Sequence, residues 1–448
     1  MSRFDEFLRA ACKLSALGLL VGASAAHAAL PIQSWQHPSG ARVYLVETRN
    51  LPMLDVQIDV DGGGRRDPEA QTGLAGATAQ LLSGGVKAQA GQPALDENAL
   101  VEAWADLGAQ FGASATADRL SVSLRTLTEP AILRSAVQLA ARQLAAPAFP
   151  EAVWQRDRAR MVAGWQQAQT EPDTLAERSF AQAVYSGHPY GREATPDSWA
   201  RIGTQDMQAF YQRHAQACRA RVTLVGAVAR PDAEKLVNDL LQGWQAHGCQ
   251  ALPAVADVPP LTQAHTVRKP FAAAQAQVLV GQPGITRADP DFLTLLVGNH
   301  VFGGGGFTSR LMQEIREKRG LTYGVYSYFS PGLHAGAFTI GMQTRPDQAQ
   351  QAVDIIHQEI RRFVAEGPTE QELAEAKASL INGFALRLDS NRKLLDNVAS
   401  LNWNDLPLDY LDRWTQLVGA ITREQVRTAL QRVMQPDRMV TVVVGASS

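Results

Sequence analysis

The chain has 448 residues, which is more than a single domain usually contains, so we expect at least two domains. Hydrophobic residues make up 45% of the chain and charged residues 19%, the composition of a folded globular protein. The formal net charge is only -2 and the sequence contains no basic tract, which argues against a nucleic-acid partner.

The first 28 residues are typical of a secretory signal peptide. Basic residues lie within the first 13 positions, an apolar run follows at 14–23, and Ala-His-Ala at 26–28 provides the small residues of a cleavage site. The apolar run is too short to cross a bilayer, which takes about 20 residues. We therefore expect cleavage after about Ala28 and a periplasmic or secreted protein without stable membrane insertion.

Strand and helix patterns alternate in the region that follows. Leu54, Val56, Ile58 and Val60 alternate with polar residues, which predicts a strand with one buried face, and residues 120–124 repeat this pattern. Apolar periodicity predicts helices at about 72–82, 96–107, 129–145 and 151–185.

A proline-rich segment separates this region from a second one with the same mixture. Residues 246–265 contain Pro253, Pro259 and Pro260 and show no helical or strand periodicity, which is typical of a linker. Beyond it we expect strands near 277–281, at 322–329 and at 337–344, helices at 289–302 and 308–318, and three or four helices between 346 and 434. Hairpin-sized gaps between strands favour an α+β sandwich over a doubly wound parallel sheet.

A weak internal repeat supports duplicated halves. Thr204 and Thr422 each precede an amphipathic helix that leads into a buried strand, and these strands end at Gly226 and Gly445. The two spacings differ by a single residue, which favours a duplication. We therefore expect a signal peptide at 1–28, an N-terminal αβ domain at 29–245, a linker at 246–265 and a C-terminal αβ domain at 266–448.

Cys218 and Cys249 remain after removal of the signal peptide, which contains Cys12. A disulfide between them would close a loop of about 30 residues and contribute roughly 3–4 kcal/mol. Two separate buried thiols are equally compatible with the sequence, because spacing alone does not show that the two Cβ atoms meet.

Several catalytic motifs are missing. The sequence has no G-x-S-x-G elbow and no phosphate-binding G-x-x-x-x-G-K-[ST] loop. Gly303, Gly304, Gly305 and Gly306 are not followed by lysine, so we expect a flexible loop before a helix at Thr308. No two histidines lie three or four residues apart, the spacing that a helical zinc site requires. We expect no metal site in this chain.

Taken together, several segments resemble the pitrilysin/insulinase family of metallopeptidases, in its mitochondrial-processing-peptidase-like branch. The matching segments are Leu-Pro-Met-Leu-Asp-Val at 51–56, Gly-Gly-Gly-Arg-Arg-Asp at 62–67, Gly-Leu-Ala at 73–75, His-Pro-Tyr-Gly at 188–191, Ser-Arg-Leu at 309–311 and Ile-Arg-Glu-Lys-Arg-Gly-Leu-Thr-Tyr-Gly at 315–324. The resemblance spans nearly all of the chain after the signal peptide. It implies two homologous αβ halves, each an antiparallel or mixed sheet packed with helices, that form half of a clam-like chamber.

The sequence departs from that family at its metal site. In active members Gly-Leu-Ala is followed by H-x-x-E-H, whose two histidines bind zinc and whose glutamate activates water. Gly76, Ala79 and Gln80 occupy the three functional positions here. The family's third ligand is a glutamate about 75 residues further on, whereas residues 152–170 contain only Asp157 as a carboxylate. The resemblance therefore implies a degenerate zinc site, no cofactor in this chain and no peptide cleavage by the chain alone.

The family's R-x-x-x-x-x-x-Y pair is retained as Arg316 and Tyr323. We expect Arg316 near the end of a helix that stops at Gly320, and Tyr323 at the start of a strand. The resemblance implies that the arginine binds substrate carbonyls and that the tyrosine stabilises the developing oxyanion.

These features imply complementation between subunits. In heterodimeric members of the family one subunit holds zinc and its partner supplies the Arg/Tyr half-site. The sequence therefore predicts a non-catalytic, substrate-binding subunit of an exported zinc endopeptidase that cleaves short or unfolded peptides, with a homologous H-x-x-E-H partner that binds the zinc. The loop Gly303–Gly306 is similar to the glycine-rich loop of zinc-less mitochondrial subunits and is predicted to admit substrate or to form an interface. The alternative is a non-enzymatic peptide-binding or scaffold protein of the same fold.

Overall fold

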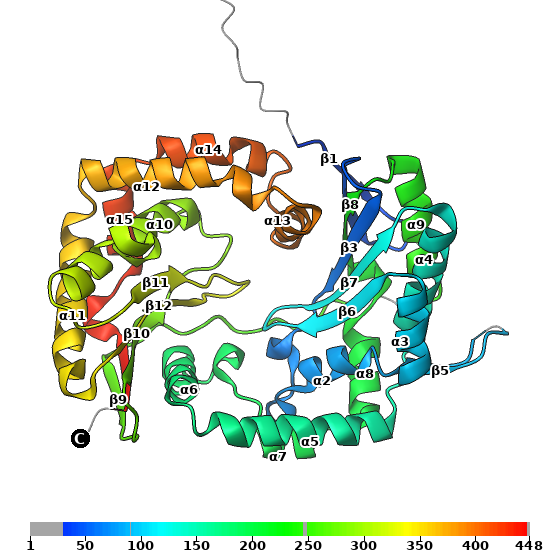
Figure 1. Cartoon of the computed structure of the whole chain (residues 1–448), viewed down its shortest axis with the longest axis horizontal. Helices are drawn as coiled ribbons and strands as arrows, with labels where there is room; N and C mark the ends of the chain where they lie inside the picture. Colours follow the sequence, from blue (N-terminus) through cyan, green and yellow to red (C-terminus); the bar gives the residue numbers. More distant parts are fainter. Residues whose placement is uncertain (1–29, 90, 245–248, 446–448) are drawn as a thin grey trace, which may run out of the picture.

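The computed structural model describes residues 30–89, 91–244 and 249–445, which contain two separate main sheets with helices around them (Figure 1). Within these ranges no helix is both long and apolar enough to span a bilayer. The signal peptide predicted at 1–28 lies outside the described residues.

The first sheet has six strands in the order β1-β2-β8-β3-β7-β6. Strands β2 and β8 run parallel, and all the other neighbouring pairs are antiparallel. The strands are β1 (Ile32–Gln36), β2 (Arg42–Glu47), β3 (Met53–Val60), β6 (Gln110–Ala115), β7 (Leu120–Leu127) and β8 (Arg221–Gly226), and β4 (Gly85–Val86) pairs separately with β5 (Leu95–Asp96).

Eight α-helices are interleaved with these strands. They are α2 (Leu74–Leu81), α3 (Glu97–Asp106), α4 (Pro130–Ala145), α5 (Glu151–Ala168), α6 (Pro172–Tyr185), α7 (Pro196–Ala200), α8 (Thr204–His214) and α9 (Arg230–Leu241) in the described part of the first half. The single helix predicted at 151–185 is thus divided into α5 and α6. Pro172 explains the division, because proline has no N–H for the helix interior but fits the first turn of a new helix.

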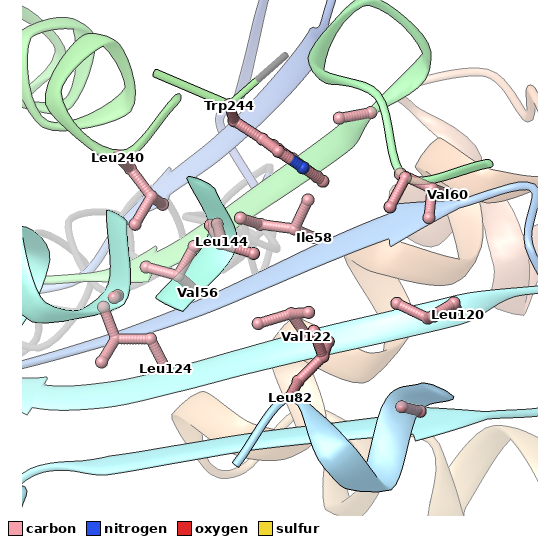
Figure 2. Packing of buried hydrophobic residues seen from close by; sticks show 14 of the residues in the cluster. Val56, Ile58, Val60, Leu82, Leu120, Val122, Leu124, Leu144, Leu240 and Trp244 are labelled. Carbon is pink, nitrogen blue, oxygen red and sulfur yellow. The ribbon is translucent and has the colours of Figure 1, made fainter. Parts of the chain in front are cut away.

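The hydrophobic core of the first half forms on one face of its sheet. Val56 and Ile58 of β3 lie beside Val122 of β7, and Leu144 and Trp244 cover them from the helical side (Figure 2). None of these side chains is more than 5% exposed. Burial of one such aliphatic side chain stabilises the fold by about 1.5–3 kcal/mol.

The second sheet has five strands in the order β11-β12-β10-β13-β9, of which only β13 and β9 run parallel. The strands are β9 (His265–Lys269), β10 (Ala276–Pro283), β11 (Val325–Phe329), β12 (Ala337–Thr344) and β13 (Val440–Val444). The helices are α10 (Phe292–Asn299), α11 (Ala349–Glu366), α12 (Glu370–Gly383), α13 (Asn391–Trp403), α14 (Tyr410–Ala420) and α15 (Arg423–Val433).

Both halves share one plan, which confirms the predicted α+β fold of two related halves. In each sheet an early strand of the half pairs in parallel with its last strand, as β2 with β8 and β9 with β13. Helix α8 precedes β8 and helix α15 precedes β13, as the repeat predicts. Gly226 and Gly445 end these strands with φ of 156° and 103°, values that glycine accepts readily.

One helix of each half packs on the sheet of the other half. Helix α6 packs on β10 and β13, where Phe180 and Val184 meet Leu279 and Val442. Helix α13 packs on β3 and β8 of the first sheet, and Val398 belongs to the cluster there. The sequence did not reveal this exchange. Each sheet is therefore covered in part by a helix from the other half.

The second face of β3 is therefore buried as well, which corrects the prediction of a strand with one buried face. Asp55 and Asp59 are each 1% exposed beneath α13. Arg125 Nε donates to Asp55 at 2.7 Å, and Arg119 Nη1 donates to Asp59 at 3.2 Å. These ion pairs satisfy carboxylates that would otherwise be costly to bury.

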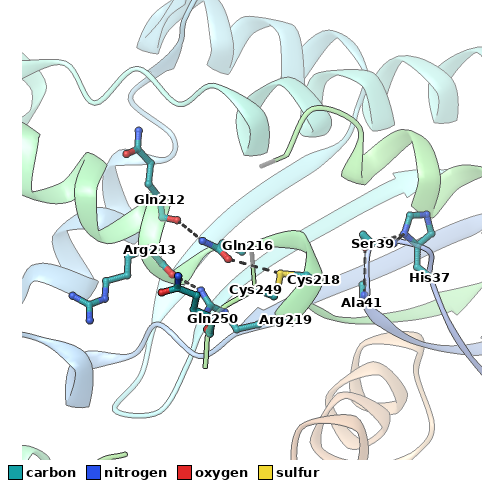
Figure 3. Close-up of a disulfide and its surroundings, with 10 residues drawn as sticks. All are labelled: His37, Ser39, Ala41, Gln212, Arg213, Gln216, Cys218, Arg219, Cys249 and Gln250. Carbon is teal, nitrogen blue, oxygen red and sulfur yellow. Dashed lines mark hydrogen bonds between the residues drawn. A yellow bond between two sulfur atoms is a disulfide. The ribbon is translucent and has the colours of Figure 1, made fainter. Parts of the chain in front are cut away.

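A disulfide joins Cys218 to Cys249, with their Cα atoms 6.3 Å apart, and resolves the question that spacing left open (Figure 3). It fixes the start of the described linker to the first half. Arg219 Nη1 also donates to the Gln250 carbonyl at 2.8 Å. Residues 249–264 form no helix or strand.

Candidate functional site

Helix α2 carries the positions predicted to be a degenerate zinc motif, and a buried carboxylate holds its first turn. Asp67 accepts hydrogen bonds from the N–H groups of Gly73 at 2.8 Å and Ala75 at 2.9 Å. Burial raises the pKa of Asp67 to about 6, although the backbone donors oppose this change. The turn is therefore fixed immediately before the helix begins at Leu74.

Gly76, Ala79 and Gln80 lie on one side of α2, because residues three and four apart share a helix face. Gly76 and Gln80 are exposed, whereas Ala79 is 2% exposed and belongs to the core. A Cβ added at Gly76 would have no atom within 4 Å. This surface of α2 therefore has room for larger side chains than those present.

A carboxylate from α5 lies against the same surface. Gln80 Nε2 donates to Asp157 Oδ2 at 3.0 Å, and Asp157 is 5% exposed. Arg156 binds Asp157 Oδ1 at 2.8 Å and reaches both oxygens of Glu97 at 2.6 and 2.8 Å. The sequence showed Asp157 only as an isolated carboxylate, because its neighbour Gln80 lies 77 positions earlier in the chain.

The groups around α2 do not suit a bound zinc ion. Gln80 binds the carboxylate of Asp157, whose charge is already balanced by the guanidinium of Arg156. Zinc in proteins takes histidine, cysteine and carboxylate ligands, usually three or four together. Across residues 30–89, 91–244 and 249–445 no group of three such side chains could hold a metal ion.

Arg316 and Tyr323 meet in one open pocket of about 490 Å³ in the second half. Arg316 Nη1 donates to Glu317 at 2.9 Å, and the guanidinium lies 4.7 Å from the centre of the Phe307 ring. Tyr323 is 88% exposed. The structure thus brings the predicted pair together at the surface.

The local structure around this pair differs from the prediction in two ways. Arg316 belongs to a π-helical segment, Met312–Glu317, instead of a regular α-helix. The strand β11 begins at Val325, so Tyr323 precedes it. Thr322 Oγ1 donates to the Gly324 carbonyl at 2.8 Å and accepts from the Gly324 N–H, which forms a turn that keeps Tyr323 out of the sheet.

The start of the glycine segment is helical and packed, which corrects the prediction of a flexible loop there, whereas Gly304 and Gly306 are exposed. Residues His300–Gly304 form a π-helical segment that continues α10, and Gly306–Thr308 form a 3₁₀ turn. Gly303 is buried, and a Cβ there would lie 2.7 Å from the Ser327 backbone nitrogen in β11. Asn299 Nδ2 also donates to the Ser327 carbonyl at 2.9 Å. Gly303 thus allows this segment to lie directly against the edge of the second sheet, while Gly304, Gly305 and Gly306 carry the chain onward to Phe307.

Arg310, in the Ser-Arg-Leu motif, anchors the segment that carries Arg316. Its guanidinium makes two hydrogen bonds to Glu372, at 2.6 and 2.7 Å, and one to the Gly367 carbonyl at 3.0 Å. It also lies 4.9 Å from the centre of the Phe363 ring. Arg310 is therefore a positioning residue, which sequence reasoning had noted only as part of a motif.

Comparison with known proteins identifies the family. A family model described as Peptidase M16 inactive domain matches residues 201–380. The crystal structure of a peptidase M16 inactive domain from Pseudomonas fluorescens matches with a TM-score of 0.87 and 31% sequence identity, covering 94% of this chain and 98% of that chain. The chain belongs to the peptidase M16 family. The resemblance drawn from the sequence motifs is confirmed.

Other M16 relatives differ in length and in name. The Helicobacter pylori protein called non-peptidase homolog YmxG is 26% identical, over 84% of this chain and 85% of that protein. The periplasmic protease PqqL from Escherichia coli shares the fold with a TM-score of 0.78 and 19% identity, and the match covers 93% of this chain but 45% of PqqL. This M16 chain spans about three fifths of the curated relatives called uncharacterized zinc proteases in Streptomyces coelicolor and Mycobacterium leprae.

The His-Pro-Tyr-Gly motif of this M16 chain lies where the two halves meet. Tyr190 Oη donates to Asp118 at 2.5 Å and accepts from the His334 N–H at 3.2 Å, and the Leu333 N–H donates to Asp118 at 2.9 Å. His188 Nε2 lies 3.0 Å from the Ala256 carbonyl in the linker. The motif therefore connects the first half, the linker and the β11–β12 turn.

Proposed function

We propose that this M16 chain is the non-catalytic, substrate-binding subunit of an exported zinc metalloendopeptidase. It supplies Arg316 and Tyr323 to the zinc site of a homologous partner that carries H-x-x-E-H. One observation carries the proposal: Arg316 and Tyr323 line one open pocket, whereas Gly76, Ala79 and Gln80 stand at the metal-motif positions.

The relatives support this role. The Pseudomonas structure that matches along almost its whole length is described as an inactive M16 domain, and the Helicobacter relative is named a non-peptidase homolog. The match to 45% of PqqL is consistent with an M16 protease that contains two units of this size. A separate partner chain would supply the second unit here.

The chemistry of the pair suits peptide hydrolysis in a shared site. Arg316 presents N–H donors that can bind a substrate carbonyl, and its contacts with Glu317 and Phe307 hold the guanidinium near the pocket. Tyr323 has an exposed hydroxyl that can donate to an oxyanion as it forms. In this proposal the zinc belongs to the partner, because the groups around Gln80 do not suit it.

Reconstitution with the partner tests the proposal. We expect the chain alone, and a partner preparation alone, to cleave an unfolded peptide slowly or not at all, and the mixture to cleave it readily. Arg316→Ala and Tyr323→Phe should each lower kcat/KM of the mixture by about 10²–10³-fold, the usual effect of removing an oxyanion donor. Arg362→Ala on helix α11 is the matched control.

Two results would count against this role. Cleavage that is unchanged by both substitutions would rule out the proposed role of Arg316 and Tyr323. Proteolysis by the purified chain alone would show that no partner is required. Peptide binding without cleavage in any mixture would favour a scaffold or peptide-binding protein, the role that the name of the Helicobacter relative suggests.

A further inference from the structure

Two histidines lie against each other where the two halves meet. His188 belongs to the His-Pro-Tyr-Gly motif, and His334 belongs to the turn between β11 and β12. Their ring centroids are 5.1 Å apart, with an interplanar angle of 60°. His188 is 5% exposed, and the side chain of His334 is 12% exposed. The proposed peptidase role uses neither residue. Two imidazoles this close can both be protonated only at a cost, because their charges would repel each other.

The linker crosses this point under a series of contacts. We name residues 249–258 the linker strap, which begins at the disulfide between Cys218 and Cys249 (Figure 3). Carbonyl groups along the strap accept hydrogen bonds from side chains of the first half: Gln250 from Arg219, Pro253 from Arg66 and Ala256 from His188. The next residue, Asp257, contacts His334 of the second half. The histidine pair therefore holds the far end of the strap against both halves.

The contacts of His188 show which of its nitrogens carries hydrogen. The Tyr190 N–H donates to His188 Nδ1 at 3.1 Å, so Nδ1 is an acceptor without hydrogen. The hydrogen is therefore on Nε2, which donates to the Ala256 carbonyl at 3.0 Å. Both nitrogens of the neutral ring are satisfied. A further proton has to enter at Nδ1, where it would displace the Tyr190 N–H.

His334 can take a proton without losing a contact. Its Nδ1 lies 3.2 Å from Asp257 Oδ1, and a carboxylate only accepts, so the hydrogen of the neutral ring lies on Nδ1. Among the described residues no group bonds to its Nε2, where a proton can enter. The protonated ring would form an ion pair with Asp257. We therefore expect the first proton on His334 and the second on His188.

The surroundings disfavour that second proton. Burial, followed by the charge of His334, lowers the pKa of His188 below its usual 6.5. Asp118 favours the charged ring, but it already accepts hydrogen bonds from Arg65 at 3.0 Å and from Tyr190 at 2.5 Å. The titratable and charged side chains around the pair come from the 3₁₀ turn before α2, the β6–β7 turn, the end of α6 with the motif after it, and the strap: Arg65, Asp118, Tyr185, Tyr190, Arg192 and Asp257.

We propose that His188 and His334 form an acid-sensitive latch on the linker strap. At neutral pH the uncharged ring of His188 holds the Ala256 carbonyl and caps the turn of its own motif. On acidification a proton from solvent enters at His188 Nδ1, breaks the bond to the Tyr190 N–H and repels the charged His334. His188 then leaves the junction and releases the strap around Ala256, while the disulfide keeps Cys249 attached. This device does not depend on the proposed subunit role.

Hydrogen exchange of the intact chain, followed by mass spectrometry of peptides that cover 186–192, tests the proposal. In the latched form the N–H groups of residues 188 and 190–192 are all hydrogen-bonded. The released form binds one more proton, so each pH unit below the usual pKa raises its population about tenfold. After correction for the intrinsic pH dependence of exchange, we expect protection of this segment to fall about tenfold from pH 7.5 to pH 5.5. Thermolysin cleavage within the strap, measured relative to a free peptide of the same sequence, should rise in parallel.

Two variants assign the effect to the pair. In H188N the asparagine still accepts from the Tyr190 N–H at the cap position but cannot take a proton, so protection should not change with pH. In H334Q the amide still donates to Asp257 but carries no charge, so release should begin at a lower pH than in the wild type. His265→Gln, at an exposed position on β9, and His214→Gln, at a buried histidine outside the pair, are the controls and should retain the acid release.

Four outcomes would overturn the latch. They are equal protection of 186–192 at pH 7.5 and pH 5.5, a fall that persists in folded H188N, release in H334Q at the same pH as in the wild type, and an equal fall in the amides of β3, which would mean general loss of structure. Thermal unfolding shows whether each variant is folded. If H188N does not fold, the shift in H334Q decides.

Discussion

Burial of His214 links the stability of the first half to pH. The residue is 6% exposed, and its Nδ1 lies 3.2 Å from the Asp61 carbonyl. Burial lowers the pKa of His214 from its usual 6.5 to about 4. Between these values the unfolded chain binds a proton that the folded chain does not, so the free energy of unfolding falls as the pH falls.

We predict that His214→Gln removes this part of the pH dependence. From pH 7 to pH 4 the wild type should lose up to about 3 kcal/mol more stability than the variant, since each pKa unit corresponds to about 1.4 kcal/mol. Urea unfolding at several pH values measures the difference. His265→Gln, at an exposed position on β9, is the control and should follow the wild type. Parallel curves for wild type and His214→Gln would contradict the prediction.

Gly303 offers a second test, because its lack of a side chain lets the π-helical segment lie against β11. We predict that Gly303→Ala lowers the free energy of unfolding by about 1–3 kcal/mol, the usual cost of forcing an extra methyl group into a packed site. Gly76→Ala is the control, because nothing lies within 4 Å of its added Cβ. That change should stabilise helix α2 by up to about 1 kcal/mol. Equal effects of the two substitutions would show that the segment is not packed as described.

At the scale of elements, the geometry around α2 can be tested by restoring ligands. We predict that the variant G76H/Q80H binds zinc, because two histidines four residues apart share a face and Asp157 lies next to position 80. Addition of Arg156→Ala should tighten binding, since that guanidinium competes for Asp157. Metal content after dialysis and calorimetric titration measure this.

The single variant Q80H is the control for this prediction, since one histidine and one carboxylate make a weak site. If G76H/Q80H and G76H/Q80H/R156A retain no more zinc than Q80H does, Asp157 does not lie within ligand distance of the helix.

The sequence predicted the elements better than it predicted their surroundings. The strand at 54–60 and the paired helices were visible because apolar periodicity depends only on local burial. The two π-helical segments in the described residues were not visible, since a change to i→i+5 hydrogen bonds over five or six residues is too short to alter the apolar periodicity of the sequence detectably. The exchange of α6 and α13 also left no local signal, because each helix simply has an apolar face.

The candidate site was predictable to a similar degree. Motif spacing singled out Arg316 and Tyr323, and both line one pocket. It could not reveal the contact between Gln80 and Asp157, nor the contact between His188 and His334, because both depend on which distant segment lies nearby.

At the scale of the whole molecule, the exchanged helices join the two halves. We predict that a fragment of residues 29–250 does not fold stably by itself, because Val225 and its neighbours on β8 would lose the cover of α13. The intact chain should unfold in one cooperative transition. Urea unfolding followed by circular dichroism and by tryptophan fluorescence checks this. Two separated transitions, or a well-folded fragment, would contradict it.

The disulfide contributes to stability on the same scale. Cys218 and Cys249 are separated by 31 residues, so the double variant C218S/C249S should lose roughly 3–4 kcal/mol of unfolding free energy through a less restricted unfolded chain. Unfolding with and without a reductant gives the measurement. The variant itself should be insensitive to reductant, and an equal loss in both proteins would point to an unrelated effect.

The late position of α13 has a consequence for biosynthesis. Residues 391–403 close the second face of a sheet whose first strand begins at residue 32. The N-terminal half therefore cannot reach its native state on the ribosome before almost the entire polypeptide has been translated. A chain that is still incompletely folded can pass through a narrow translocation channel, whereas a folded domain is too wide to do so.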